Sequence, residues 1–243
     1  KVVAGGSAAA AVADNIDKLV ADKVASRIAA KDFTLWGKDA EAESSIRLGW
    51  VNSAKDSLPL VEPIVALRNE FAAKGVTRFV LCGMGGSSLA PEVITRTAGV
   101  ELVVLDSTHP DQIADALAGD LSKTAIVVSS KSGSTVETDS QKRIFEKAFT
   151  DAGIDKTDRI VIVTDPGSPM EAAAKADGYR IFNADPNVGG RYSALTAFGL
   201  VPSGLAGVDI QALLDSANSV ADLLASDSPD NPALVLGAAL GAT

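Results

Sequence analysis

The sequence predicts an α/β fold, a doubly wound five-stranded parallel sheet that follows an N-terminal helical extension. Short runs rich in Val, Ile and Leu recur between residues 78 and 182. Their continuous apolar character is typical of strands that are covered on both faces. Stretches with helical start signals separate these runs. Such alternation implies parallel strands joined by right-handed crossovers.

Composition limits the class of protein. The chain has 243 residues, of which 47% are hydrophobic and 22% charged, as is ordinary for a globular protein. No stretch approaches the ~20 apolar residues of a membrane-spanning helix, and residues 1–11 do not resemble a signal peptide. The net charge of −9 argues against a surface that binds nucleic acid or a membrane. Because residue 1 is not Met, we expect the numbering to begin inside a longer chain.

The chain has one cysteine, Cys82, and one histidine, His109. Cys82 lies in an apolar run, where we expect a buried strand residue. A disulfide framework is excluded, and so is a Cys/His zinc site within this chain. A single cysteine fits a reducing cytoplasm.

The first expected region, residues 1–58, is the helical extension. Residues 12–30 carry an apolar side chain at every fourth position, which predicts an amphipathic helix. Residues 31–58 mix Trp and Gly with polar residues and are expected to be irregular. A second amphipathic helix is predicted over 60–74, where Gly75 ends it.

The second expected region, residues 59–205, holds the sheet. Its helices have start signals: Pro110 follows His109, and both 134–137 and 168–171 read as Ser-x-x-Glu capping boxes. The five predicted strands are 78–82, 101–105, 125–129, 160–164 and 179–182.

The third expected region, residues 206–243, is a helical segment that leads to a missing second domain. Apolar spacing predicts a helix over 210–225. A polar break over 227–232 precedes an apolar stretch, 233–242, that begins like a helix. We expect this helix to continue in sequence that follows.

In a doubly wound sheet, ligands bind beyond the carboxyl ends of the strands, where the strand order reverses. The loop after the first predicted strand, 83–88, reads GMGGSS. Gly85 and Gly86 would let the backbone approach an anion at a helix N-terminus. The loop also nearly matches a dinucleotide fingerprint, with Ser88 in place of the third Gly and Asp106 able to hold a ribose. A tight turn, an anion site and a nucleotide site all remain open for this loop.

The loop after the third predicted strand, 129–135, is more specific. It reads SSKSGST, so five hydroxyls and Lys131 stand directly before a helix. A phosphate monoester is nearly a dianion and offers only acceptor oxygens, for which these groups and the helix N–H groups are complementary donors. We therefore predict a phosphate site. With Ser134 left to cap the helix, the hydroxyls available to a ligand are those of Ser130, Ser132 and Thr135.

Three charged or titratable residues allow more than one role. Glu137 could be a general base, but we favour a helix cap that also allows a polar contact to a sugar. The loop after the fifth predicted strand, 187–193, reads NVGGRYS and presents Arg191 on a glycine turn. That guanidinium could stabilise an oxyanion or pair with an acid of the chain. His109 is expected to start a helix rather than to catalyse.

Together, three motifs resemble the phosphoglucose isomerase family. They are GMGGSSLAP at 83–91, SKSGSTVET at 130–138 and VGGRYS at 188–193. The runs LWG at 35–37 and LGW at 48–50 look like the actinobacterial branch, some members of which are fused to a transaldolase. The resemblance covers nearly the whole chain but only the first part of the family's catalytic unit. It implies a sugar isomerase (SIS) domain with a flavodoxin-like strand order.

The resemblance also implies a reaction. The family interconverts glucose 6-phosphate and fructose 6-phosphate through a cis-enediolate, without metal or organic cofactor, in glycolysis and gluconeogenesis. It implies that Arg191, next to Gly190, lies beside the enediolate. By the same resemblance, the phosphate would be held by Ser130, Ser132, Thr135 and the Lys131 backbone, with help from Ser87 and its neighbours Gly85 and Gly86.

The sequence departs from the family in ways that affect this expectation. The family's catalytic Glu, its ring-opening His and a C-terminal Lys lie further along than this sequence runs, and His109 does not match that His. Pro186 stands where many members have an acid. We therefore expect the 243 residues to bind phosphosugar weakly without isomerising it, and the full-length parent to be an active homodimer.

Three alternatives remain. A phosphosugar-sensing SIS module without catalysis would not need Arg191. A nucleotide-binding or NAD-dependent enzyme would not need the hydroxyl-rich loop at 129–135. The third alternative is a fragment that keeps the fold and has lost function.

Overall fold

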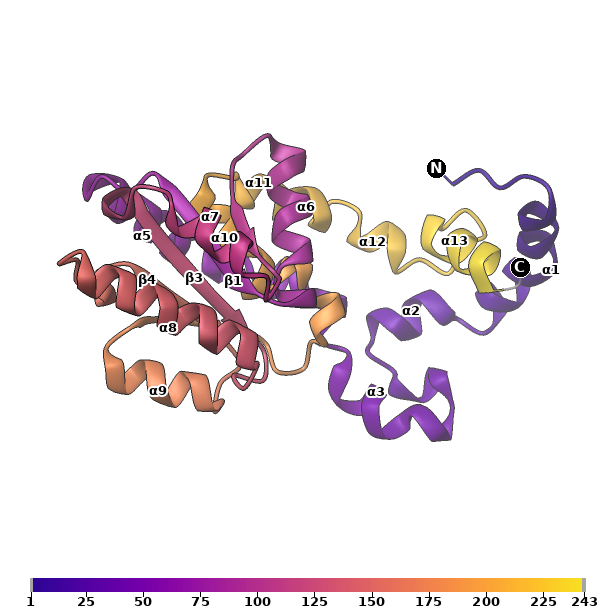
Figure 1. Ribbon diagram of the computed structural model, residues 1–243. Coiled ribbons are helices and arrows are strands. Elements are labelled where there is room, and N and C mark those ends of the chain that lie inside the picture. Colours follow the sequence, from indigo (N-terminus) through magenta and orange to yellow (C-terminus); the bar gives the residue numbers. More distant parts are fainter. Residues whose placement is uncertain (1, 242–243) are drawn as a thin grey trace. The chain divides into compact units, whose positions relative to one another are not determined.

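The computed structural model describes residues 2–241 and contains two compact units (Figure 1). One unit, Ser53–Leu214, holds the sheet and all of the candidate loops. The other combines Lys1–Asn52 with Asp215–Thr243, and its described residues form helices joined by short turns. The domain boundaries expected after residues 58 and 205 stay predictions.

The larger unit contains a sheet of five parallel strands, which confirms the predicted fold class. Each strand lies within two residues of its predicted ends. Along the sheet the order is β2-β1-β3-β4-β5, so the strand order reverses between β1 and β3. The strands are β1 (Arg78–Gly83), β2 (Val103–Leu105), β3 (Thr124–Ser130), β4 (Ile160–Thr164) and β5 (Arg180–Asn183).

Successive residues of the strands face two separate cores, as the alternation of side chains along a strand requires. In β3, Ala125 and Val127 contribute to one core, whereas Ile126 and Val128 contribute to the other. Every residue of β3 and β4 is buried. This double coverage explains why the strands read as continuous apolar runs.

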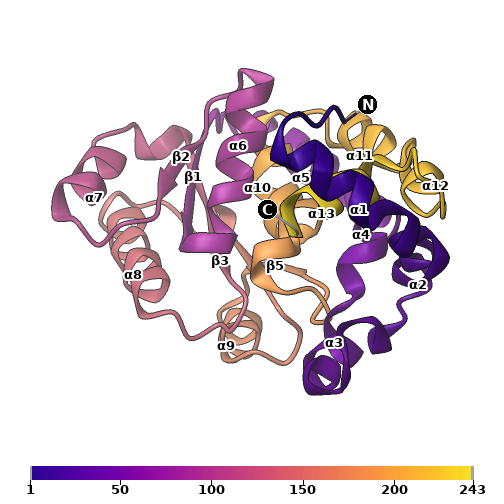
Figure 2. The ribbon, with the colours of Figure 1, turned by 90° about the vertical axis from the view of Figure 1, so that its right-hand side faces the viewer.

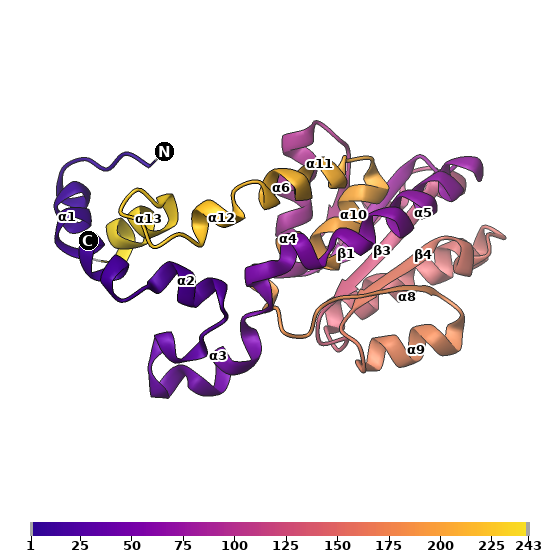
Figure 3. The same cartoon turned by 180° about the vertical axis from the view of Figure 1, so that it is seen from behind.

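Helices cover both faces of the sheet, and Figure 2 shows the strands between the two layers. One layer is seen in Figure 3, which views the molecule from the side opposite to Figure 1. This layer consists of α5 (Val61–Ala73), α6 (Leu89–Ala98), α10 (Ala197–Ala206) and the start of α11 (Ile210–Asn218). The other consists of α7 (Pro110–Leu117), α8 (Val136–Asp151) and α9 (Pro169–Asp177). Short helical turns precede one helix and two strands of this unit. They are α4 (Ser53–Asp56) and η4 (Leu58–Leu60) before α5, η6 (Leu121–Lys123) before β3, and η7 (Lys156–Asp158) before β4.

The helix α10 was not predicted from the sequence. All its residues except the last, Ala206, are buried, so the helix has no polar face that would reveal a period of 3.6 residues. Pro202 lies inside it and also argues against a helix when only the sequence is read. Its start is capped by Thr196, whose Oγ1 accepts a hydrogen bond from the Phe198 N–H at 3.3 Å.

The smaller unit corrects two expectations. The helix predicted over 12–30 is two helices, because Lys23 adopts a left-handed conformation with φ 53° between them. Residues 31–58 are not irregular but form short helical turns. The helices and turns from residue 7 to residue 52 are α1 (Ser7–Ala21), α2 (Val24–Ala29), η1 (Phe33–Trp36), η2 (Lys38–Ala40), α3 (Glu41–Arg47) and η3 (Gly49–Asn52).

In the C-terminal segment, the helix predicted over 210–225 is interrupted, because α11 ends at Asn218. Two separate helices follow, α12 (Ala221–Leu224) and α13 (Pro232–Gly241). Within the smaller unit, Ser26 joins the two segments of the chain, because its N–H and Oγ donate to the carboxylate of Asp227 at 3.0 and 2.6 Å. None of the described helices has the length and apolar character needed to span a membrane.

Candidate functional site

The candidate loops lie at the carboxyl edge of the sheet. Gly83 at the end of β1 pairs with Ser129 near the end of β3, so the loops that follow these two strands begin side by side. This is the point where the strand order reverses, and it is where ligands bind in doubly wound sheets.

The loop after β1 contains the turn η5 (Gly85–Ser87) and leads into α6. Ser88 is fully buried, and its Oγ donates to the Gly85 oxygen at 3.1 Å, which fixes the turn. Gly86 lies against the loop after β5: a Cβ on Gly86 would be 2.6 Å from the oxygen of Gly190. A glycine is therefore required at position 86 for the two loops to touch.

The loop after β3 is shaped by its own polar side chains. Ser130 is buried, its Oγ lies 3.0 Å from Oγ1 of Thr135, and it accepts the Gly133 N–H at 3.2 Å. Gly133 has φ 67°, and a Cβ there would be 2.9 Å from the Met170 Cβ. Both the conformation and the close approach to α9 favour glycine at this position.

The predicted capping box at 134–137 is wrong. The N-cap of α8 is Thr135, not Ser134, and no side chain of the described residues makes a capping hydrogen bond there. Ser134 instead donates to Oγ of Ser132, at 3.0 Å from its own Oγ and 3.3 Å from its N–H. The free N–H groups at the start of α8 thus remain available to an anion. Glu137 lies half-buried in the first turn of this helix.

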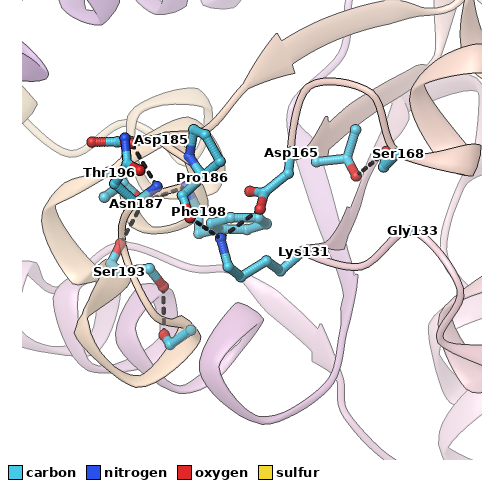
Figure 4. Close-up of polar contacts among 12 residues, drawn as sticks. Lys131, Gly133, Asp165, Ser168, Asp185, Pro186, Asn187, Ser193, Thr196 and Phe198 are labelled. Atoms are coloured by element: carbon cyan, nitrogen blue, oxygen red, sulfur yellow. Dashed lines mark hydrogen bonds and ion pairs between the residues drawn. The ribbon is translucent and has the colours of Figure 1, made fainter. Parts of the chain in front are cut away.

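Lys131 does not extend freely into solvent. Its Nζ lies 2.5 Å from Oδ2 of Asp165 and 3.5 Å from the backbone oxygen of Pro186 (Figure 4). Asp165 follows β4, and Pro186 lies in the loop after β5. Lys131 is therefore engaged with two other loops.

The loop after β5 contains the turn η8 (Gly190–Leu195), which presents Arg191. Ser193 is buried and donates to the oxygen of Gly190 at 2.7 Å, with the Gly86 oxygen 3.5 Å away. Arg191 is exposed and lies over the ring of Tyr192, with 5.8 Å from Cζ to the ring centroid. Among residues 2–241 its guanidinium is in no ion pair, so the alternative of an acid partner is not realised there.

Three other residues noted in the sequence, His109, Cys82 and Asp106, lie outside the loops after β1, β3 and β5. His109 is the N-cap of α7, where its Nδ1 accepts the Asp111 N–H at 3.3 Å, as expected for a residue that starts a helix. Cys82 is completely buried in β1, and burial raises the pKa of its thiol to about 12. Asp106 lies exposed after β2 and accepts from Gln112 at 3.4 Å.

Sequence reasoning missed the loop after β4. Thr164 at the end of this strand donates to the Ser130 oxygen at 2.7 Å, and its Oγ1 lies 2.8 Å from Oγ of Ser168, the N-cap of α9. With Asp165 bound to Lys131, this loop supports the loop after β3 from the side. A polar run, TDPGS at 164–168, directly after a buried strand was the signal that could have revealed it.

Known proteins share this architecture. A structure of a hypothetical protein from Thermus thermophilus has a TM-score of 0.72 and 33% identity, over 80% of this chain and 48% of that one. A glucose-6-phosphate isomerase structure from Chlamydia trachomatis has a TM-score of 0.65 and 28% identity, over 84% of this chain and 39% of that one.

Sequence comparison gives the same family. A probable glucose-6-phosphate isomerase of Haloarcula marismortui is 38% identical over 163 residues, which are 65% of this chain and 37% of that protein. The matched part of the chain spans between 28% and 42% of the length of the curated relatives compared with it. The family model described as phosphoglucose isomerase matches residues 60–242, a range that contains the sheet and all three motifs. The chain that folds into this sheet and its loops thus belongs to the phosphoglucose isomerase family.

Proposed function

We propose that this chain is the phosphosugar-binding part of a glucose-6-phosphate isomerase and binds glucose 6-phosphate and fructose 6-phosphate. The observation that supports this most is the loop after β3. It combines hydroxyls with the uncapped start of α8, beside the glycine loop at the point where the strand order reverses. These donors suit a dianionic phosphate better than they suit any uncharged ligand.

Within this site, the phosphate would be held by the hydroxyls of Ser132 and Thr135 and by backbone N–H groups from Lys131 onward. Ser130 would act mainly through the shape of the loop, because its hydroxyl is buried and already bonded. The Lys131 ammonium is engaged by Asp165, so its backbone is the part that faces the ligand in this proposal. Ser87, Gly85 and Gly86 would complete the site from the loop after β1.

Arg191 would lie beside the reacting carbons. This guanidinium is exposed and has no ion-pair partner among the described residues. On a turn that Gly86 and Ser193 hold, it is suited to stabilise an enediolate as its charge develops. In the part of the chain that the structure describes, no atom lies within 4 Å of the position of a Cβ on Gly190, which leaves room for a sugar next to Arg191. Glu137 would make a polar contact to the sugar.

We further propose that these residues bind the phosphosugar but do not isomerise it. The family resemblance implies that the catalytic Glu and the ring-opening His lie beyond these residues, and His109 caps a helix. A homodimer with shared sites and a cytoplasmic location remain predictions for the full-length protein.

The test combines binding with turnover on one sample of confirmed intact mass. Thermal shift and amide chemical-shift titration would compare fructose 6-phosphate, fructose, inorganic phosphate and NAD, because a ligand raises stability in proportion to ln(1 + [L]/Kd). We expect fructose 6-phosphate to shift the amide signals of Ser132, Gly133 and Gly190, and fructose and NAD to leave them unchanged.

Turnover would be followed in both directions with a coupled assay for the product. Binding without turnover would support the proposal. Turnover by this chain alone would show that the general base lies within it, and Glu137 and His109 would then be the residues to replace. A chain that binds NAD but not fructose 6-phosphate would refute the proposed substrate.

A further inference from the structure

Lys131 spans the carboxyl ends of three neighbouring strands. It follows β3, and its Nζ contacts Asp165 after β4 at 2.5 Å and the Pro186 oxygen after β5 at 3.5 Å (Figure 4). One side chain therefore connects the loop that would hold the phosphate to the loop that carries Arg191.

This ion pair is partly buried. The side chains of Lys131 and Asp165 are 25% and 17% exposed, whereas those of the surface pair Lys147 and Asp151 are 76% and 61% exposed. Oδ1 of Asp165 is buried and has no hydrogen-bond partner in the part of the chain that the structure describes. Lys131 is thus the main group that holds this carboxylate, and salt would screen their attraction only weakly.

The loop that carries Arg191 is held from two sides. On one side, the backbone of Gly86 packs against Gly190. On the other, Lys131 reaches the oxygen of Pro186, five residues before Arg191. The first contact positions the turn of Arg191 against the loop after β1, and the second, longer contact connects the same loop to the loop after β3.

We propose that Lys131 and Asp165 are positioning residues that set the distance between the phosphate-binding loop and Arg191. The inference rests on the proposed function, because it concerns how one ligand reaches both loops. A phosphosugar must contact the loop after β3 with its phosphate and the loop after β5 with its sugar. Inorganic phosphate would occupy only the first loop. A change in the distance between the loops therefore affects the phosphosugar and spares inorganic phosphate.

The experiment measures Kd for fructose 6-phosphate and for inorganic phosphate by amide chemical-shift titration of the whole chain. Asp165→Asn and Lys131→Met each remove one charge of the pair. We expect both variants to bind fructose 6-phosphate about tenfold more weakly, which corresponds to about 1.4 kcal/mol of binding free energy, and to bind inorganic phosphate as the wild type does. Lys131→Arg keeps a cation that can reach Asp165 and should restore most of the affinity.

Two further variants separate positioning from folding. Asp158→Asn removes a Lys–Asp pair with Lys74 (2.9 Å) at the amino end of the strands and should change neither affinity. The double variant Lys131→Met/Asp165→Leu leaves no unpaired buried charge, so it should fold and show the same selective loss.

Each contrary result has its own meaning. If Lys131→Met weakens both ligands while Asp165→Asn weakens neither, the ammonium contacts the phosphate directly and the positioning role is wrong. Equal affinities of all variants for fructose 6-phosphate would also overturn it. If the wild type binds inorganic phosphate but no fructose 6-phosphate, the proposed function fails, and the positioning role fails with it.

Discussion

The contact between Gly86 and Gly190 gives a prediction about a single methyl group. A Cβ at Gly86 would lie 2.6 Å from the oxygen and 2.8 Å from the carbonyl carbon of Gly190. Ordinary van der Waals contact begins at 3.4 Å, so the two loops would have to separate by about 0.8 Å. Both atoms belong to the backbone and cannot move aside as the end of a flexible side chain could. Gly86→Ala must therefore displace the loop that carries Arg191.

The expected loss of folding stability can be estimated from other sites where a side chain was made too large for its space. Inserting a methyl group into a packed contact destabilises a protein by about 1–3 kcal/mol. In a domain of this size, 1 kcal/mol corresponds to a change of about 2–4 °C in Tm, so we expect Gly86→Ala to lower Tm by several degrees. The hydrogen bond from Ser193 to Gly190, 2.7 Å long, would be disturbed too. Affinity for fructose 6-phosphate should fall with the shift of Arg191.

The same contact offers a matched control. A Cβ on Gly190 meets no atom of residues 2–241 within 4 Å, and neither glycine has a positive φ. Gly190→Ala should therefore change the free energy of unfolding by less than about 0.5 kcal/mol, yet weaken phosphosugar binding by filling space beside Arg191. Thermal and urea denaturation of both variants would test this. Equal stability of Gly86→Ala and Gly190→Ala would refute the reasoning.

Three other predictions concern single side chains. Hydrogen bonds from Lys175, Asn183 and the Gly167 N–H lower the pKa of Glu171 from 4.5 to about 2. The stability this adds is present above about pH 4.5 and is lost as the pH falls towards 2, so the difference in Tm between wild type and Glu171→Gln should be constant near neutrality and vanish near pH 2. Cys82 is inaccessible and its pKa is raised to about 12; a thiol reagent at pH 8 should react only at the rate of unfolding, and fast reaction of the folded chain would contradict its burial. Asn231 is fully buried and forms three hydrogen bonds with backbone groups; Asn231→Ala should cost about 2–4 kcal/mol in urea denaturation, and a loss near zero would show that water replaces these bonds.

The strands could be predicted because their signal is local. Double coverage makes each strand a continuous apolar run, and a polar or glycine-rich loop ends it. The helices were harder in two cases. Apolar residues continue to recur at every fourth position across Lys23 in the sequence. The left-handed conformation of Lys23, which separates the two helices, leaves this spacing unchanged. In α10 the whole surface is buried, which removes the contrast between faces on which periodicity depends.

The site was predictable to the level of its loops but not of its side chains. The motifs after β1, β3 and β5 were identified because each combines glycine or hydroxyl residues with a helix start. The part played by Asp165 could not be found this way, since its partner Lys131 lies 34 residues away and no spacing rule connects them. Only the pairing of β3 with β4 brings the two side chains together.

The loop after β3 shows why residue type alone does not assign a ligand contact. Five hydroxyls and a lysine all suit a phosphate, yet Ser130 bonds to the loop itself and Lys131 to a neighbouring loop. A phosphate would then be met mostly by neutral donors, Ser132, Thr135 and backbone N–H groups, whose positions the buried groups determine. Such a site binds through geometry more than through net charge. Its affinity should depend less on ionic strength than that of a site built on a free lysine, and a salt titration of fructose 6-phosphate binding would distinguish the two.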